Sequence, residues 1–236
     1  MVRLIGSIAI CLVYTLFYDW GDTLYYYNKS VYLKKLFFDD IGNNWILFFS
    51  EFYKNEIINI PGFPLQVIEK ANMYLAIRIA TFINIFLFDS FFGISLIFAL
   101  WGFLGSWKLY KVFYDYNPNI SAKAATFCLY LPSIVMWGSG IFKDTISFGA
   151  MGILIYCIYM LFIKRVNKVK YWLWVLVCVY LVGVVKAYIL MALFPSIFFF
   201  IINQYTSTIK STALKTIVFP VLLGVIVLLS FGVLTL

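Results

Sequence analysis

The stretch Pro132-Ser-Ile-Val-Met-Trp-Gly-Ser-Gly-Ile-Phe-Lys-Asp-Thr145 places two charged residues, Lys143 and Asp144, between long apolar segments. The flanking segments, 123–141 and 145–163, are each close to the roughly 20 apolar residues that a helix needs to cross hydrocarbon. Ionisable side chains at the edge of hydrocarbon are costly, so they usually pair with each other or mark a functional site. The stretch therefore predicts a helical membrane protein with a candidate site at Lys143-Asp144.

The composition of the whole chain agrees with this prediction. Of its 236 residues, 64% are hydrophobic and only 12% are charged, whereas a soluble domain is about 25% charged. The chain has no histidine, which excludes Ser-His-Asp and Cys-His catalysis and histidine-ligated metals. The four cysteines all fall inside apolar stretches, which is typical of small core residues and not of a disulfide framework.

The apolar segments predict an all-α, polytopic transmembrane helix bundle with about seven spanning helices, in a single integral-membrane domain over residues 1–236. The candidate spans are 4–18, 91–107, 123–141, 145–163, 171–187, 188–203 and 214–234. Residues 19–70 are predicted to form one long outer loop that contains short interfacial helices. The apolar end, Phe231 to Leu236, has no polar flank, so we expect the chain to be incomplete at its C-terminus.

Segment 72–90 is apolar but contains Arg78 and ends at Asp89. If it does not cross, seven crossings put every basic cluster on the cytoplasmic side, as the positive-inside rule favours. We therefore expect a re-entrant or steeply tilted element; a tight helical hairpin that turns at Asp89-Ser90 is the alternative. The basic clusters are Arg3; Lys108, Lys111 and Lys123; Lys164, Arg165, Lys168 and Lys170; and Lys210 and Lys215.

In this topology the N-terminus is cytoplasmic, and the charged candidates share the outer face. Asp19 and Asp22 follow the first helix, and Lys186 ends the fifth. A carboxylate can take the proton from an attacking hydroxyl, and a lysine can neutralise the charge that develops on a departing phosphate. The charges therefore suit a reaction on a lipid-linked phosphate.

Ordinary structural roles are the alternative for each candidate. Lys143-Asp144 would start a helix, where an acid favours the dipole and a lysine snorkels outward. Asp19 and Asp22 would form a solvated flank, and Arg78 would anchor the helix at the interface.

The order of these features resembles the glycosyltransferase C superfamily, whose members are multi-spanning enzymes that take a sugar from a polyprenyl-phosphate donor. The shared pattern is a first helix, a long outer loop that opens with an acid, an Arg-bearing apolar segment, and a helix ending P-S-I-V-M-W-G-S-G-I-F-K-D. The resemblance implies a catalytic or metal-linked carboxylate at Asp22 or Asp19, with Asp144 as a second site carboxylate. The phosphate contacts that we predict are Lys143, Lys186 and Arg78.

We expect a glycosyltransferase of the bacterial inner (cytoplasmic) membrane that moves a sugar from a polyprenyl-phosphate-linked donor to an acceptor at the outer face, in cell-surface glycan assembly. A polysaccharide polymerase is an alternative enzyme, and a transporter or non-catalytic scaffold is an alternative of another class. The expected partners are the lipid-linked sugar and the bilayer, and not nucleic acid, because topology accounts for the basic clusters. No cofactor is assigned, and a divalent metal stays open.

Overall fold

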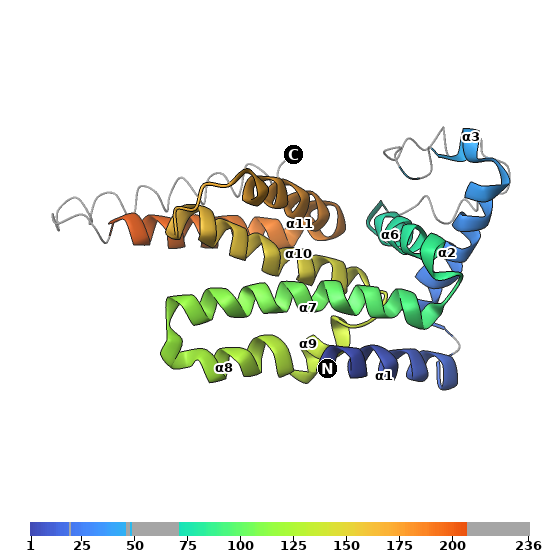
Figure 1. The fold of residues 1–236 in the computed structure, drawn as a ribbon, viewed down its shortest axis with the longest axis horizontal. Helices are drawn as coiled ribbons and strands as arrows, with labels where there is room; N and C mark the ends of the chain where they lie inside the picture. Colours follow the sequence, from blue (N-terminus) through green and yellow to red (C-terminus); the bar gives the residue numbers. More distant parts are fainter. Residues whose placement is uncertain (19, 46–47, 49–70, 207–236) are drawn as a thin grey trace.

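The computed structural model describes residues 1–18, 20–45, 48 and 71–206, and the regular secondary structure there is helical (Figure 1). Three of these helices are long and apolar enough to cross a membrane: Phe91–Tyr116, Lys143–Ile163 and Val169–Ile201. Val2–Leu16 and Met73–Leu87 are shorter apolar helices. The predicted all-α membrane fold is confirmed, whereas the seven predicted spans are not established. The predicted span 214–234 lies outside the described residues.

The helices surround α7, which is the longest straight element in Figure 1. Helices α1, α8 and α9 lie along one side of α7, α10 and α11 lie along the other, and α2 and α6 lie where α7 begins. The described α-helices are α1 (Val2–Leu16), α2 (Asp22–Asp39), α3 (Ile41–Asn44), α6 (Ala71–Leu87), α7 (Phe91–Tyr116), α8 (Ser121–Ala125), α9 (Pro132–Trp137), α10 (Lys143–Ile158) and α11 (Val169–Thr206).

Helices α7 and α10 pack side by side through glycines. A β-carbon at Gly105 would overlap the backbone of Gly149, and one at Gly152 would overlap the backbone of Gly105. Only residues without a side chain let two helix backbones come this close. Trp101 adds a hydrogen bond from its Nε1 to the Ile146 carbonyl oxygen at 3.1 Å. Because Trp101 precedes Gly105 and Ile146 precedes Gly149, the two helices run in the same direction.

Helix α11 breaks at Lys186, whose backbone is non-helical (φ −149°, ψ 75°). In the first arm, Trp174 contacts Trp101 in the middle of α7, with ring centroids 6.3 Å apart. In the second arm, Phe200 lies 5.7 Å from Tyr116 at the far end of α7. The arms therefore run in opposite directions, which agrees with the separate helices predicted over 171–187 and 188–203.

The prediction of one continuous helix over 123–141 is wrong. After α8, a π-helical turn ends at Tyr130, and Leu131 is extended (φ −60°, ψ 123°) before α9 begins at Pro132. The ring of a proline clashes with a helical conformation of the residue before it, which accounts for the break. Helix α9 ends at Trp137, and Gly138 begins the bend that leads into α10.

Segment 72–90 consists of α6 and a tight turn. Phe88 and Asp89 have positive φ angles of 49° and 62°, and the Ser90 side chain caps α7 by accepting a hydrogen bond from the Gly93 N–H at 3.1 Å. This turn lies where the hairpin alternative placed it. The position of the segment relative to the membrane, re-entrant or crossing, stays a prediction.

The turn at Asp89 also ties α2 to α6. The Asp89 carboxylate accepts hydrogen bonds from Lys34 Nζ at 2.7 Å and from the buried Asn84 amide at 2.8 Å. Tyr27 donates its hydroxyl to the Asp89 carbonyl oxygen at 2.7 Å. The hydrogen bond from Lys34, followed by that from Asn84, lowers the pKa of Asp89.

We predict that Gly105→Ala destabilises the protein by about 2 kcal/mol, because the added methyl group would force the α7 and α10 backbones apart. The free energy of unfolding in an SDS titration measures the effect. Gly183→Ala is the matched control, since its β-carbon would meet only the flexible Leu190 side chain, at 3.3 Å. Equal stabilities of the two variants would contradict the close packing of α7 and α10.

We predict that Asp89 makes stability depend on pH. Its pKa is lowered in the folded state, so its contribution is present above the unfolded pKa of about 4 and is lost as the pH falls through the folded pKa. The Asp89 side chain is 40% exposed, so solvent limits the contribution to about 0.5 kcal/mol.

Melting temperatures in detergent between about pH 6 and about pH 3 test this point. The wild type should lose more stability on acidification than Asp89→Asn, and Asp39→Asn, an exposed acid at the end of α2, should keep the wild-type profile. If the melting temperatures of the wild type and Asp89→Asn fall equally with pH, Asp89 is not a source of the pH dependence.

Candidate functional site

Asp144 and Lys186 form an ion pair between α10 and the break in α11. Helix α10 begins at Lys143, so Asp144 lies in the first turn, where the helix dipole favours a negative charge. Lys186 reaches the carboxylate because the reversal of α11 carries residue 186 to the start of α10. The Asp144 side chain stays 43% exposed, so the pair remains accessible to a ligand.

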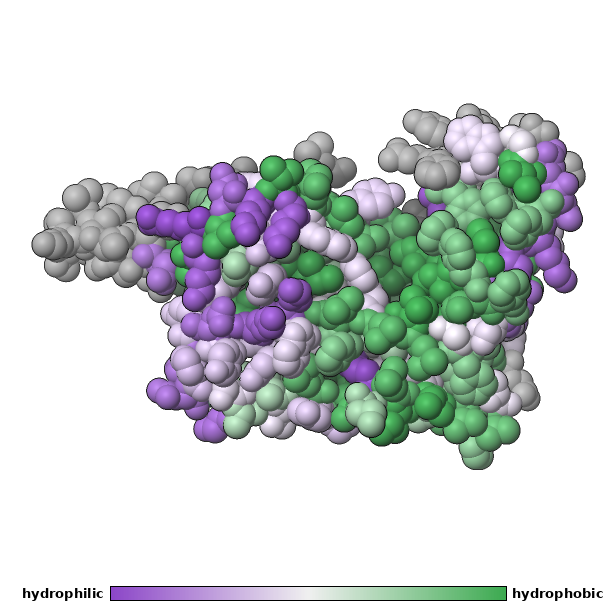
Figure 2. Space-filling view, in the orientation of Figure 1, coloured by the Kyte–Doolittle hydropathy of each residue, from purple (hydrophilic) through white to green (hydrophobic). Residues whose placement is uncertain are grey.

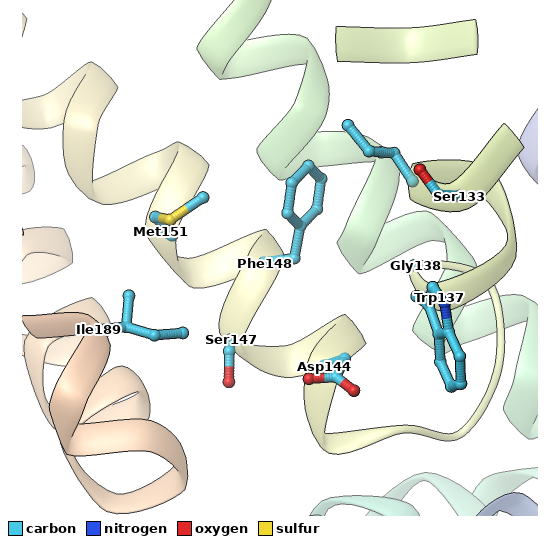
Figure 3. Close-up of a pocket in the computed structure, with 9 residues that line it drawn as sticks. Ser133, Trp137, Gly138, Asp144, Ser147, Phe148, Met151 and Ile189 are labelled. Carbon is cyan, nitrogen blue, oxygen red and sulfur yellow. The ribbon is translucent and has the colours of Figure 1, made fainter. Parts of the chain in front are cut away.

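A cavity of about 290 Å³ opens beside Asp144 (Figure 3). Its walls come from α9, α10 and the second arm of α11. Ser133, Asp144 and Ser147 supply polar side chains, and Trp137, Phe148, Met151 and Ile189 are among the apolar ones. The cavity therefore combines one carboxylate with a largely apolar wall, which is the usual make-up of a ligand site.

Asp22 approaches the same region from the start of α2. The hydroxyl of Tyr26, one helical turn further on, is buried and has no hydrogen-bond partner in the described part of the chain. Burial raises the pKa of Tyr26, and the charges of Asp22 and then Asp144 raise it further. Both carboxylates therefore lie within electrostatic reach of one hydroxyl.

The other predicted site residues have different surroundings. Lys143 is half-buried and forms no ion pair with any described residue. Arg78 stacks over Tyr74 on its own helix, at 4.2 Å from the ring centroid. Asp19 lies outside the described residues.

The structure thus brings three predicted residues, Asp22, Asp144 and Lys186, to one end of the bundle. Tyr26 was not among the predicted site residues. A signal for it was present, because residues four apart in a helix share a face and Tyr26 is four residues after Asp22.

A divalent metal remains an open prediction. In the ranges that the structure describes, no three or more Asp, Glu, Cys or His side chains gather closely enough to hold an ion.

These features define a helical membrane protein with a charged site and an apolar cavity at one end of its bundle. Residues 72–231 match the family described as dolichyl-phosphate-mannose-protein mannosyltransferase, and the chain belongs to that family. The family consists of membrane glycosyltransferases of C type that depend on polyprenyl-phosphate sugars, so the predicted resemblance is confirmed.

The matched region contains Asp144, Lys186 and Arg78 but begins after Asp22. No curated protein and no solved structure matches the chain significantly.

We predict that Asp144 and Lys186 are energetically coupled. A double-mutant cycle with Asp144→Asn and Lys186→Gln should give a coupling energy of about 1 kcal/mol, the upper end for an ion pair that water still reaches. Unfolding in an SDS titration measures it. The matched control replaces Lys186→Gln by Lys143→Gln, whose charge is adjacent in sequence but unpaired with Asp144. Coupling to Lys143 as large as that to Lys186 would contradict the assigned pair.

Proposed function

We propose that this chain transfers a sugar from a polyprenyl-phosphate donor to an acceptor hydroxyl at the outer face of a bacterial inner membrane, as a step in cell-surface glycan assembly. One observation carries the proposal. In a member of this glycosyltransferase family, the ion-paired carboxylate of Asp144 opens onto an apolar cavity, at the end of the bundle that also holds Asp22.

The reaction needs a base for the acceptor and a cation for the donor phosphate. The bond between the anomeric carbon and the phosphate oxygen breaks, the acceptor oxygen bonds to the same carbon, and the acceptor proton must leave. A carboxylate held near the acceptor can take this proton, and a cation stabilises the negative charge that stays on the departing phosphate.

We assign the base to Asp22 and the cation to Lys186. Asp22 has no ion-pair partner in the described ranges, so its carboxylate is available to accept a proton. Asp144 holds Lys186 at the edge of the cavity until the donor phosphate arrives, and the lysine then shares its charge between the carboxylate and the phosphate. Asp19 is the alternative base, and Lys143 and Arg78 are the further phosphate contacts that we propose.

The apolar cavity suits the first isoprenoid unit of the donor or an apolar part of the acceptor. Burying such a group removes hydrocarbon from contact with water or headgroups, while the phosphate stays at the charged rim near Asp144. The cavity would therefore hold the donor with its anomeric carbon near the carboxylates. Such positioning supplies a large share of the rate enhancement in two-substrate reactions.

The proposed membrane face follows from the distribution of charge. The site lies at the start of α10. A π-helical turn, Tyr159–Ile163, continues α10 at its other end, and four basic residues follow this turn: Lys164, Arg165, Lys168 and Lys170. Clusters of lysine and arginine favour the cytoplasmic side, which supports an outer-face position for the opposite end, where the site lies.

We predict that Asp22→Asn lowers the rate of sugar transfer by about 10²- to 10⁴-fold, because the acceptor loses its base, while binding of the donor is retained. Lys186→Gln should weaken donor binding and lower the rate, and Lys143→Gln and Arg78→Gln should mainly raise the KM for the donor. Transfer of a labelled sugar from a polyprenyl phosphate by the reconstituted protein measures these effects.

The matched control is Asp115→Asn, an exposed carboxylate near the other end of α7, which should leave the rate unchanged. Full activity of Asp22→Asn with loss in an Asp19→Asn variant would move the base to Asp19. Full activity of both variants and of Lys186→Gln would favour the non-catalytic scaffold.

A further inference from the structure

Three lysines gather at the end of the bundle opposite Asp144. Lys108 and Lys111 lie on the last turns of α7, and Lys170 lies at the start of α11. The ammonium group of Lys108 is within electrostatic reach of both other lysines. Figure 2 shows hydrophilic side chains gathered at this end, while the middle of the molecule is mostly hydrophobic.

Aromatic rings from three helices hold these lysines in place. Lys108 Nζ lies 4.4 Å from the centroid of the Tyr156 ring on α10, and Lys111 lies 5.8 Å from that of Trp107. Lys170 lies 5.1 Å from the ring centroid of Tyr171, which itself packs against Tyr156. A ring attracts a cation without neutralising it, so these contacts orient the ammonium groups and leave them able to attract an anion.

None of the three lysines forms an ion pair with a carboxylate in the described ranges. The ion pairs Lys34–Asp89 and Lys186–Asp144 lie at the other end of α7. The nearest acid in sequence, Asp115, follows Lys111 by one helical turn and forms no ion pair. Ammonium groups gathered without a counter-ion repel each other, and a bound anion would remove that repulsion.

We propose that Lys108, Lys111 and Lys170 form a binding site for the phosphate of an anionic phospholipid headgroup. All three lie near the ends of helices that are long and apolar enough to cross a membrane, so the phosphate is presented at headgroup depth. Tryptophan and tyrosine rings concentrate at that depth, and Trp107, Tyr156 and Tyr171 line this cluster. The site is independent of the sugar-transfer site.

The test is native mass spectrometry of the purified protein with phosphatidylglycerol, phosphatidylcholine or inorganic phosphate. The wild type should retain phosphatidylglycerol in preference to phosphatidylcholine. Lys108→Gln/Lys111→Gln should lower that retention by about tenfold, because each lysine near a headgroup contributes several-fold to binding. Lys108→Arg/Lys111→Arg should keep it, which shows that the loss follows charge.

The matched control is Lys29→Gln/Lys35→Gln on α2, which removes the same charge and includes a lysine that also lies over a ring, Lys29 over Tyr25. An equal loss in this control would overturn the site in favour of general charge attraction. Equal retention of the two lipids would also overturn it. Binding of inorganic phosphate at the same lysines, with no preference for the anionic lipid, would replace the headgroup by a soluble anion.

Discussion

The close approach of α7 and α10 at Gly105 and Gly149 is the constraint on which the rest of the structure depends. It aligns the two helices in parallel, so both start at the end that holds Asp144 and both finish at the end that holds Lys108. The first arm of α11 packs against this pair and runs back, which brings Lys186 to Asp144. If α7 and α10 were further apart, the positions of Asp144 and Lys186 relative to each other would no longer be fixed by helix packing.

Arg3 stabilises the packing around α7 on the side away from α11. Its guanidinium is buried, and it donates hydrogen bonds to the Ile134 carbonyl oxygen at 2.7 Å and to Ser106 Oγ at 2.5 Å. These bonds tie α1 to α7 and α9, next to Gly138, where the chain leaves α9 for α10. Arg3 was predicted to be one of the cytoplasmic basic clusters, because the positive-inside rule puts such charges on that side. Only its tertiary partners show that it lies inside the bundle.

Local patterns predicted what depends on a few neighbouring residues. Apolar length predicted helices at α7, α10 and both arms of α11. Pro132 was a visible signal against one helix over 123–141, and the apolar run outweighed it wrongly. The partner of Asp144 could not be predicted, because Lys186 is 42 residues away and reaches it only through the reversal of α11. The cavity depends on three helices and has no sequence pattern.

The structural and the chemical interpretations of Lys143-Asp144 are compatible. The start of α10 favours a negative charge at Asp144, and the break in α11 supplies Lys186 as its partner, so an ordinary helix start holds the carboxylate and its counter-ion in a fixed position. A carboxylate that positions a catalytic lysine needs the same fixed geometry, together with access to a ligand. The exposed side of Asp144 and the adjoining cavity provide that access. A helix start that leaves its acid open to a cavity is therefore where a site would arise in this fold.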